Sequence, residues 1–231
     1  MTLYIAIDDT DILSSRGTGR LARSIAGSIS ESGYTVSVSR HQLYVHPDIP
    51  YTSHNSCAVI HIESDECLPD TLFSMAKDMV LDDFIEGSDP GIACAADHQV
   101  TADIVGFGLS AKKTVLTQDR ARSVAREAGL LLEGLGGTND GIIGALAGLG
   151  LAAPGCDGRY VMKGRLRQIS GETTVETVLN AGVDEVITKD GLSLKTGTII
   201  VRKFPKPSRV NKNAILYVEE RDGIYHETVR D

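Results

Sequence analysis

The chain has 231 residues, of which 42% are hydrophobic and 23% are charged. This length fits one large domain or two small ones, and either can bury a sizeable core. The longest apolar stretches are far shorter than the roughly 20 residues that span a bilayer, so we expect a soluble protein and no membrane partner. The first strand-like residues run directly into Asp8 and Asp9 without a signal sequence, which predicts a cytoplasmic location.

The net charge of −8 is distributed unevenly. Residues 1–154 contain 10 Lys and Arg against 20 Asp and Glu, a net charge of −10, whereas residues 155–231 contain 13 against 11, a net charge of +2. Nucleic-acid binding through counterion release requires a basic face, so tRNA is not expected as a partner. A basic cluster near two prolines is interpreted as a solvated loop that could meet phosphate: Arg202, Lys203, Lys206, Arg209 and Lys212.

Cysteine and histidine spacing argues against a transition-metal site. The cysteines Cys57, Cys67, Cys94 and Cys156 are separated by 10, 27 and 62 positions, which fits neither zinc knuckles nor a compact disulfide framework. The histidines His41, His46, His54 and His61 lie 5, 8 and 7 positions apart, which is not the spacing of a His-x-His or His-x-x-x-His motif. Free thiols are expected, with His61 a structural residue of a strand.

The first half of the chain alternates strand and helix patterns. Residues 3–7 predict a buried strand that ends at acidic residues, and residues 20–31 predict a helix after a polar, glycine-containing loop. Further strands are predicted at 34–39, 42–45 and 57–62, followed by a helix at 71–83. An acidic cluster, a glycine loop and a helix therefore follow the first strand directly.

The second half contains a change of character near Pro154. Before it, the sequence predicts a turn at 89–91, a strand at 92–96, a helix at 117–132 and a buried apolar helix at 142–151. After it, short strands are predicted at 160–169, 185–188, 198–203 and 214–220. We therefore expect an α/β (α+β) fold with a domain at 1–155 and a small β-rich module at 156–231.

Three carboxylates follow the first predicted strand within four positions: Asp8, Asp9 and Asp11. Their mutual repulsion is costly without a counter-charge, and oxygen ligands suit Mg²⁺, which uses one or two carboxylates and keeps water or phosphate in its remaining positions. We interpret Asp8 and Asp11 as metal ligands and Asp9 as the residue that positions a water or an acceptor hydroxyl. All three are candidate catalytic residues.

Two glycine loops, at 16–19 and 134–141, each lead into a predicted helix, where free backbone N–H groups can hold an anion. Neither loop matches the Walker or dinucleotide-binding motif. Together with the carboxylates they predict nucleotide phosphates bridged by Mg²⁺. The candidate cofactor-binding residues are Thr10, Arg16, Gly17, Thr18, Gly19, Gly136, Gly137, Thr138 and Asn139.

One loop carries candidate substrate-binding residues. It covers 47–55, follows His46 and contains His54 and Asn55, and we interpret these three side chains as polar substrate-binding residues.

The acidic cluster has an alternative interpretation. Asp9 and Asp11 could instead form the Asp-x-Asp pair of a haloacid-dehalogenase phosphatase. In that alternative, position 13 should be Thr or Val, but it is Leu13.

Four motifs occur in the order found in archaeal agmatidine synthetase: IDDTD at 7–11 with RG at 16–17, PDIPY at 47–51, DPG at 89–91 and GIIGALA at 141–147. The chain resembles this family over residues 3–152. The family uses ATP to activate an anticodon cytidine of an isoleucine tRNA and attaches agmatine. The resemblance implies a kinase-like domain in which the aspartates form a Mg-ATP site.

The sequence departs from the family in two places. The family has Cys-Thr-Thr after Arg-Gly where this chain has GRL at 19–21, and it has Lys-Thr-Arg-Gly-Asn where this chain has TSHNS at 52–56. Two hypotheses follow. The first is a Mg-ATP-dependent enzyme that phosphorylates or activates a small-molecule or nucleotide-type substrate. The second is a non-catalytic protein that binds a nucleotide or small ligand. The oligomeric state is open.

Overall fold

The computed structural model describes residues 1–15, 17–52, 54–63 and 68–228, so the predicted site residue Arg16 and Cys67 lie outside the described residues. The chain forms two compact units, Met1–Pro154 and Gly155–Asp231. The mixed α/β class is confirmed. No helix in the described ranges is long and apolar enough to cross a membrane.

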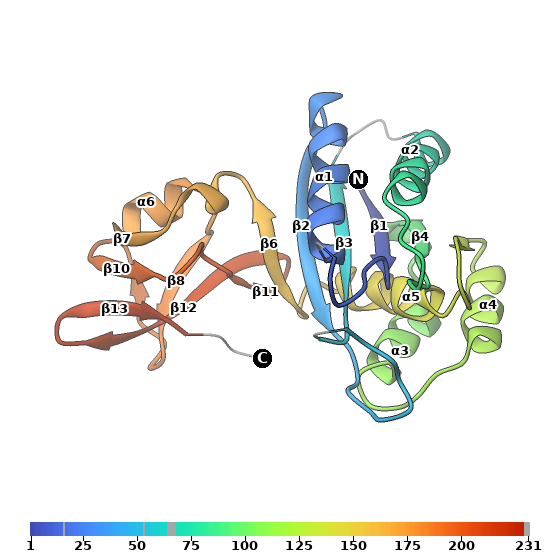
Figure 1. Cartoon of the computed structure of the whole chain (residues 1–231). Helices are drawn as coiled ribbons and strands as arrows, with labels where there is room; N and C mark the ends of the chain where they lie inside the picture. The colour runs from blue at the N-terminus through green and yellow to red at the C-terminus, as the bar shows by residue number, and fades with distance from the viewer. Residues whose placement is uncertain (16, 53, 64–67, 229–231) are drawn as a thin grey trace. The chain divides into compact units, whose positions relative to one another are not determined.

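Five strands in the described part of the first unit form an antiparallel sheet in the order β5-β4-β1-β3-β2 (Figure 1). Helices α1 and α2 pack on one face, and α5 packs on the other face with α3 and α4 against it. The elements are β1 (Thr2–Asp8), α1 (Thr18–Glu31), β2 (Thr35–Gln42), β3 (Ser56–Glu63), α2 (Pro69–Asp82), β4 (Gly91–Ala96), a 3₁₀ turn (Asp97–Gln99), α3 (Ala102–Ser110), α4 (Gln118–Glu127), β5 (Leu131–Gly134) and α5 (Gly141–Ala152).

Strand β1 lies at the centre of this sheet, and its sequence explains why. Leu3, Ile5 and Ile7 are fully buried on one face, while Tyr4 and Ala6 join the apolar cluster beneath α5 on the other. A strand covered on both faces is apolar at every position rather than alternating. Asp8 is the first charged residue and the last residue of β1. The acidic cluster therefore lies at the carboxyl end of the central strand.

Helix α5 approaches the sheet closely because small residues face it. A Cβ atom at Gly148 would lie 3.0 Å from Val59 Cγ2 and 3.1 Å from Cys57 Sγ, so a larger side chain would push the helix away. The helix is buried along nearly its whole length, which confirms its predicted burial. This close approach brings the start of α5 to the end of β1.

Several predicted elements were wrong in extent. Residues 43–45 form no strand, because β2 ends at Gln42 and the chain leaves the sheet. The helix predicted at 117–132 ends at Glu127, because Gly129 adopts a φ of +65° and the following residues pair with β4 as β5. Helix α3 was not predicted, since its two glycines weaken the helical pattern.

The regular structure of the second unit is mainly strand, with one short helix and one 3₁₀ turn among its described residues. Its described strands run in the order β6-β11-β12-β13-β10-β7, and β8 pairs in parallel with β12 and antiparallel with β9. The predicted strand at 160–169 stops at Lys163, because Gly164 turns at a φ of +50°. The elements are β6 (Arg159–Lys163), a 3₁₀ turn (Leu166–Gln168), β7 (Gly171–Thr174), α6 (Val175–Asn180), β8 (Glu185–Thr188), β9 (Ser193–Leu194), β10 (Thr198–Val201), β11 (Ser208–Val210), β12 (Asn213–Arg221) and β13 (Ile224–Glu227).

Candidate active site

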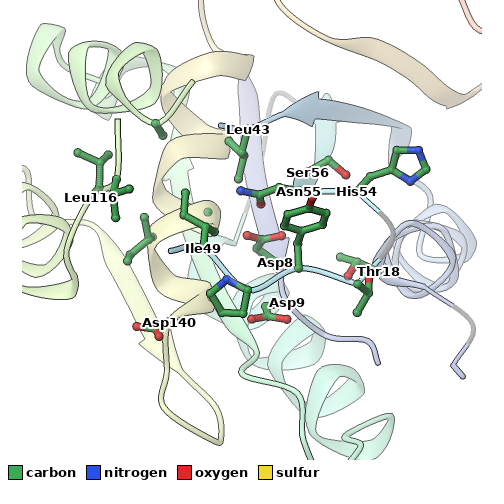
Figure 2. A pocket seen from close by; sticks show the side chains of 18 of the residues that line it. Asp8, Asp9, Thr18, Leu43, Ile49, His54, Asn55, Ser56, Leu116 and Asp140 are labelled. Carbon is green, nitrogen blue, oxygen red and sulfur yellow. The ribbon is translucent and has the colours of Figure 1, made fainter. Parts of the chain in front are cut away.

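A cavity in the first unit lies where β1 ends and helices α1 and α5 begin (Figure 2). Its volume of about 150 Å³ greatly exceeds the roughly 10–15 Å³ that one water needs, so it can hold a ligand. Acidic groups and hydroxyls line one part and apolar side chains another. The lining residues are Asp8, Asp9, Asp11, Thr18, Leu43, Asp48, Ile49, Pro50, Tyr51, Thr52, His54, Asn55, Ser56, Ala111, Thr114, Val115, Leu116, Asp140, Gly141, Ile143 and Gly144.

Asp8 is the last residue of β1, and its carboxylate lies against the first turn of α5. A Cβ atom at Gly144 would overlap that carboxylate, so the glycine is required for Asp8 to occupy this place. Burial, followed by the charge of Asp9, raises the pKa of Asp8 to about 8. Without a cation, ionising Asp8 is therefore costly at neutral pH.

Asp9 turns the chain at the end of the strand. Its φ of +53° lies in the left-handed region, which non-glycine residues adopt infrequently and which Asp tolerates better than most. Its carbonyl accepts a hydrogen bond from the Asp89 N–H at 3.2 Å. Burial, followed by the charges of Asp89, Asp11 and Asp140, raises the pKa of Asp9 to about 6. The cleft therefore concentrates negative charge.

Asp11 is held by hydroxyl groups. Thr18 Oγ1 donates to Asp11 Oδ1 at 3.0 Å, and Thr10 Oγ1 donates to Thr18 Oγ1 at 3.1 Å. Thr52 Oγ1 donates to Asp11 Oδ2 at 3.4 Å. Thr10 and Thr18 are both buried. Thr10 does not line the cavity, and its hydroxyl holds Thr18 in place. Thr18 links Asp11 to the start of α1.

The first turn of α1 is the better placed of the two predicted phosphate loops. Gly17 precedes the helix with a φ of +85°, and among the described residues no side chain caps the helix start. A Cβ atom at Gly17 would lie 3.7 Å from Asp11 Oδ2, which places this turn beside the carboxylates; Thr18 lines the cavity, whereas Gly17 and Gly19 do not. A helix N-terminus carries a partial positive charge that favours phosphate.

The second predicted loop is used differently, and its interpretation as a phosphate cradle needs correction. Gly136, Gly137, Thr138 and Asn139 do not line the cavity. The Thr138 N–H donates to the Asp89 carboxylate, and the Asn139 N–H donates to the Gly136 carbonyl at 3.1 Å. Because these donors are already satisfied, the loop fixes the start of α5 against the Asp89 turn instead of presenting N–H groups to a ligand.

The three predicted substrate-binding residues are also placed differently from one another. His46 does not line the cavity, and its ring stacks on Tyr44 with centroids 5.3 Å apart. Asn55 lines the cavity, but its amide donates to the Tyr44 carbonyl at 2.6 Å and so closes the base of the loop. His54 lies on the rim, and Figure 2 shows its ring directed away from Asp8 and Asp9.

The remaining histidines and cysteines form no metal site in the described part of the chain. His41 and His61 are buried in the sheet, where their Nε2 atoms lie 2.7 and 2.6 Å from Ser39 Oγ, so His61 is a structural residue of its strand. Cys57, Cys94 and Cys156 are free thiols, as predicted.

Sequence reasoning missed several lining residues. Asp140 comes from the loop before α5 and accepts a hydrogen bond from Gln118 Nε2 at 2.7 Å. Asp48, Tyr51 and Thr52 also line the cavity. They belong to the loop at 47–55, from which only His54 and Asn55 were predicted to bind substrate. The PDIPY motif was the available signal, because it marked this loop as a feature of the resemblance.

The donor set is suited to a hard divalent cation, because it offers carboxylate and hydroxyl oxygens. No Lys or Arg is among the described lining residues, so that part of the lining supplies no counter-charge to the carboxylates. No three side chains in the described ranges already converge as a complete metal cage. Mg²⁺ needs no such cage, since it typically takes one or two carboxylates and completes its shell with water and phosphate oxygens.

No protein-family model and no curated protein matches this chain. Solved structures do match. They include apo agmatidine synthetase of an isoleucine tRNA, with a TM-score of 0.55 and 23% identity. Its complex with that tRNA and ATP has a TM-score of 0.56 and 24% identity, and its complex with tRNA, AMPCPP and agmatine a TM-score of 0.55 and 22% identity.

These similarities cover 64–65% of this chain but only 35–36% of the solved chains, so this chain matches about a third of their length. The resemblance is confirmed at the level of the fold. The expectation that tRNA is not a partner was wrong, because proteins with this fold have been solved in complex with tRNA. The net charge of a unit averages over its whole surface and does not report local basic patches, so it does not exclude a nucleic-acid partner.

Proposed function

We propose that this chain binds Mg-ATP in the carboxylate-lined cleft and uses it to phosphorylate or activate a nucleotide-type or small-molecule substrate. One observation carries the proposal. Asp8, Asp9, Asp11 and the start of α1 line a single cavity, in a fold that a solved ATP complex shares. Carboxylates beside a free helix N-terminus suit a metal-bound triphosphate.

The three aspartates take different roles in this proposal. Asp8 and Asp11 would hold Mg²⁺, since the environment of Asp8 makes its charge costly without a cation and Asp11 is fixed by Thr18. When bound, the metal neutralises charge on the carboxylates and the phosphate oxygens. Asp9 orients the attacking hydroxyl or water. The backbone of residues 17–19 contacts the phosphates, while apolar side chains such as Leu116 and Ile143 give the ligand a drier wall.

RNA belongs among the proposed substrates. A nucleotide within a tRNA presents a base and a hydroxyl that fit the nucleotide-type substrate class. The solved tRNA complexes of this fold support testing tRNA first. A small-molecule acceptor stays within the proposal, because the cavity itself selects only for size and charge.

A specific observation favours the second candidate, a non-catalytic nucleotide-binding protein. Phosphoryl transfer commonly uses a Lys or Arg to stabilise the transferring phosphate. The described residues that line the cavity include neither. Binding without turnover is therefore the alternative outcome of the following experiment.

The expected result is Mg²⁺-dependent consumption of ATP that increases when the correct acceptor is present. We would measure release or transfer of the terminal phosphate from radiolabelled ATP with Mg²⁺ or EDTA. Each condition is repeated with and without total tRNA. Consumption that requires Mg²⁺ supports the enzyme. ATP binding by the same protein is measured by calorimetric titration. ATP binding with no turnover under every condition supports the binding protein, and absence of ATP binding excludes both ATP-dependent proposals.

A further inference from the structure

A second cavity lies entirely within the second unit and is lined mainly by cations. Its volume is about 430 Å³. Residues 200–206 contribute most of the wall, and the end of β12 and β13 contribute the rest. The lining residues are Ile200, Arg202, Lys203, Phe204, Lys206, Arg221, His226 and Glu227.

Phe204 organises the cations at this cavity. The guanidinium carbon of Arg167 lies 4.1 Å from the centroid of the Phe204 ring, and Lys206 Nζ lies 5.3 Å from it. Cation–π contacts of this kind hold long, flexible side chains in place. Arg167 comes from the short 3₁₀ turn after β6, so segments far apart in the sequence contribute to one basic surface.

The positive charge of this surface is only partly compensated. Arg202 and Lys203 are exposed, and neither forms an ion pair with a described residue. Arg221 pairs with Glu219 at 2.9 Å on an exposed surface, where such a pair contributes little. Glu227 is the single acidic residue in the described lining, and its Oε1 accepts the backbone N–H of Lys206 at 2.7 Å. The cavity therefore selects for an anion.

The five basic residues that the sequence places between 202 and 212 have different locations in the structure, and only three of them line the cavity. Arg209 is buried, with its guanidinium 5.4 Å from the Tyr160 ring and donating to the Asp157 carbonyl at 3.3 Å. The backbone N–H of Lys212 donates to the Gly155 carbonyl at 2.9 Å. Neither residue lines the cavity. Arg202, Lys203 and Lys206 do, together with Arg221 from the end of β12, while Arg167 contacts the lining residue Phe204.

We propose that this cavity, which we call the basic cavity, binds the sugar–phosphate backbone of RNA. The inference rests on the proposed function, because RNA bound at the basic cavity would be the substrate of the ATP-dependent site. A single phosphate is typically held by donors that converge inward. Here Arg202, Lys203 and Arg221 are exposed around a cavity of about 430 Å³, which suits successive phosphates of a chain.

The test compares two double variants of the full chain that lose the same charges. Arg202→Ala with Lys203→Ala removes one Arg and one Lys from the basic cavity. Arg126→Ala with Lys195→Ala removes one exposed Arg and one exposed Lys elsewhere. Binding of a fluorescent tRNA transcript and of a labelled 12-nucleotide RNA is measured by anisotropy at several KCl concentrations. Melting curves confirm that both variants fold.

We expect the cavity variant to bind RNA at least about tenfold more weakly at about 0.1 M KCl, with a salt dependence reduced by about one to two phosphate contacts. The Arg126/Lys195 control should stay within about twofold of the wild type. Equal weakening in both variants would overturn the proposal, as would absence of RNA binding by the wild type. Displacement of RNA by about 1 mM pyrophosphate would show a free-phosphate site and also overturn it.

Mg-ATP binding by the same proteins separates this inference from the proposed function. Neither Arg202 nor Lys203 lines the carboxylate cleft, so the cavity variant should bind Mg-ATP like the wild type. Failure of the proposed function would appear as RNA binding without Mg-ATP binding. Failure of this inference would appear as Mg-ATP binding together with unchanged RNA affinity in the cavity variant.

Discussion

Asp8→Asn is expected to melt at a higher temperature than the wild type in EDTA at pH 8, although it loses activity. The ordinary pKa of Asp8, 3.8, applies to the unfolded chain, whereas burial raises the pKa in the folded protein to about 8. Between these values the unfolded state releases the proton and the folded state keeps it. Wild-type stability therefore falls as pH rises from about 4 to about 8, and Asn removes this loss.

The expected gain at pH 8 is about 1–3 kcal/mol, since part of the full shift is relieved by solvent and by local relaxation. For a chain of this size that corresponds to several degrees in melting temperature. Melting curves at pH 4 and pH 8 in EDTA check it, with the exposed Asp78→Asn in α2 as the control. If Asp8→Asn were no more stable than the wild type at pH 8, ionised Asp8 would not destabilise the folded protein, contrary to this prediction.

The same Asp8→Asn variant should lose at least about 100-fold in any Mg²⁺-dependent ATP turnover, because charge neutralisation is the main contribution of such sites. Higher stability with lower activity is the expected signature of a functional carboxylate. A structural carboxylate would show the opposite pattern, with loss of stability when its charge is removed.

Gly144→Ala is expected to abolish Mg-ATP binding although it adds only one methyl group. The new Cβ would overlap the Asp8 carboxylate, so either Asp8 must leave the cavity or α5 must move away from β1. Overpacking of this kind typically costs about 1–3 kcal/mol. Alanine is otherwise the better helix former, by up to about 1 kcal/mol, so simple propensity predicts a small gain.

Gly27→Ala in α1 is the matched control, since a Cβ atom there has nothing within 4 Å. Chemical denaturation and Mg-ATP titration of both variants provide the measurement. We expect Gly27→Ala to be neutral or stabilising with full Mg-ATP binding. If Gly144→Ala also bound Mg-ATP normally, the position of Asp8 against α5 would not matter for the site.

The local patterns that the sequence predicted well are those that depend on few neighbours. The apolar run before Asp8 marked β1, and the small, apolar residues after Gly141 marked a buried helix, because burial on all sides leaves no polar face. Asp8, Asp9 and Asp11 were singled out because they directly follow this buried strand, and all three line the cavity, while their roles stay a prediction. Each of these inferences needed only a short segment.

What the sequence could not predict depends on contacts between distant segments. The glycines at 136–137 suggested a phosphate loop, but the Asp89 carboxylate takes the Thr138 N–H. His46 and Tyr44 stack on each other, which no spacing rule could show. Arg167 contacts Phe204 of the basic cavity, and Arg221 lines that cavity from β12, so the sequence showed only part of this basic surface.

The most direct test of the Mg-ATP site is calorimetric titration of ATP into the wild-type protein and Asp8→Asn, each with Mg²⁺ and with EDTA. We expect Mg²⁺ to strengthen ATP binding to the wild type at least about tenfold, corresponding to about 1.4 kcal/mol, and the Asn variant to lose this difference. ATP affinity that is the same with Mg²⁺ and with EDTA in the wild type would contradict it.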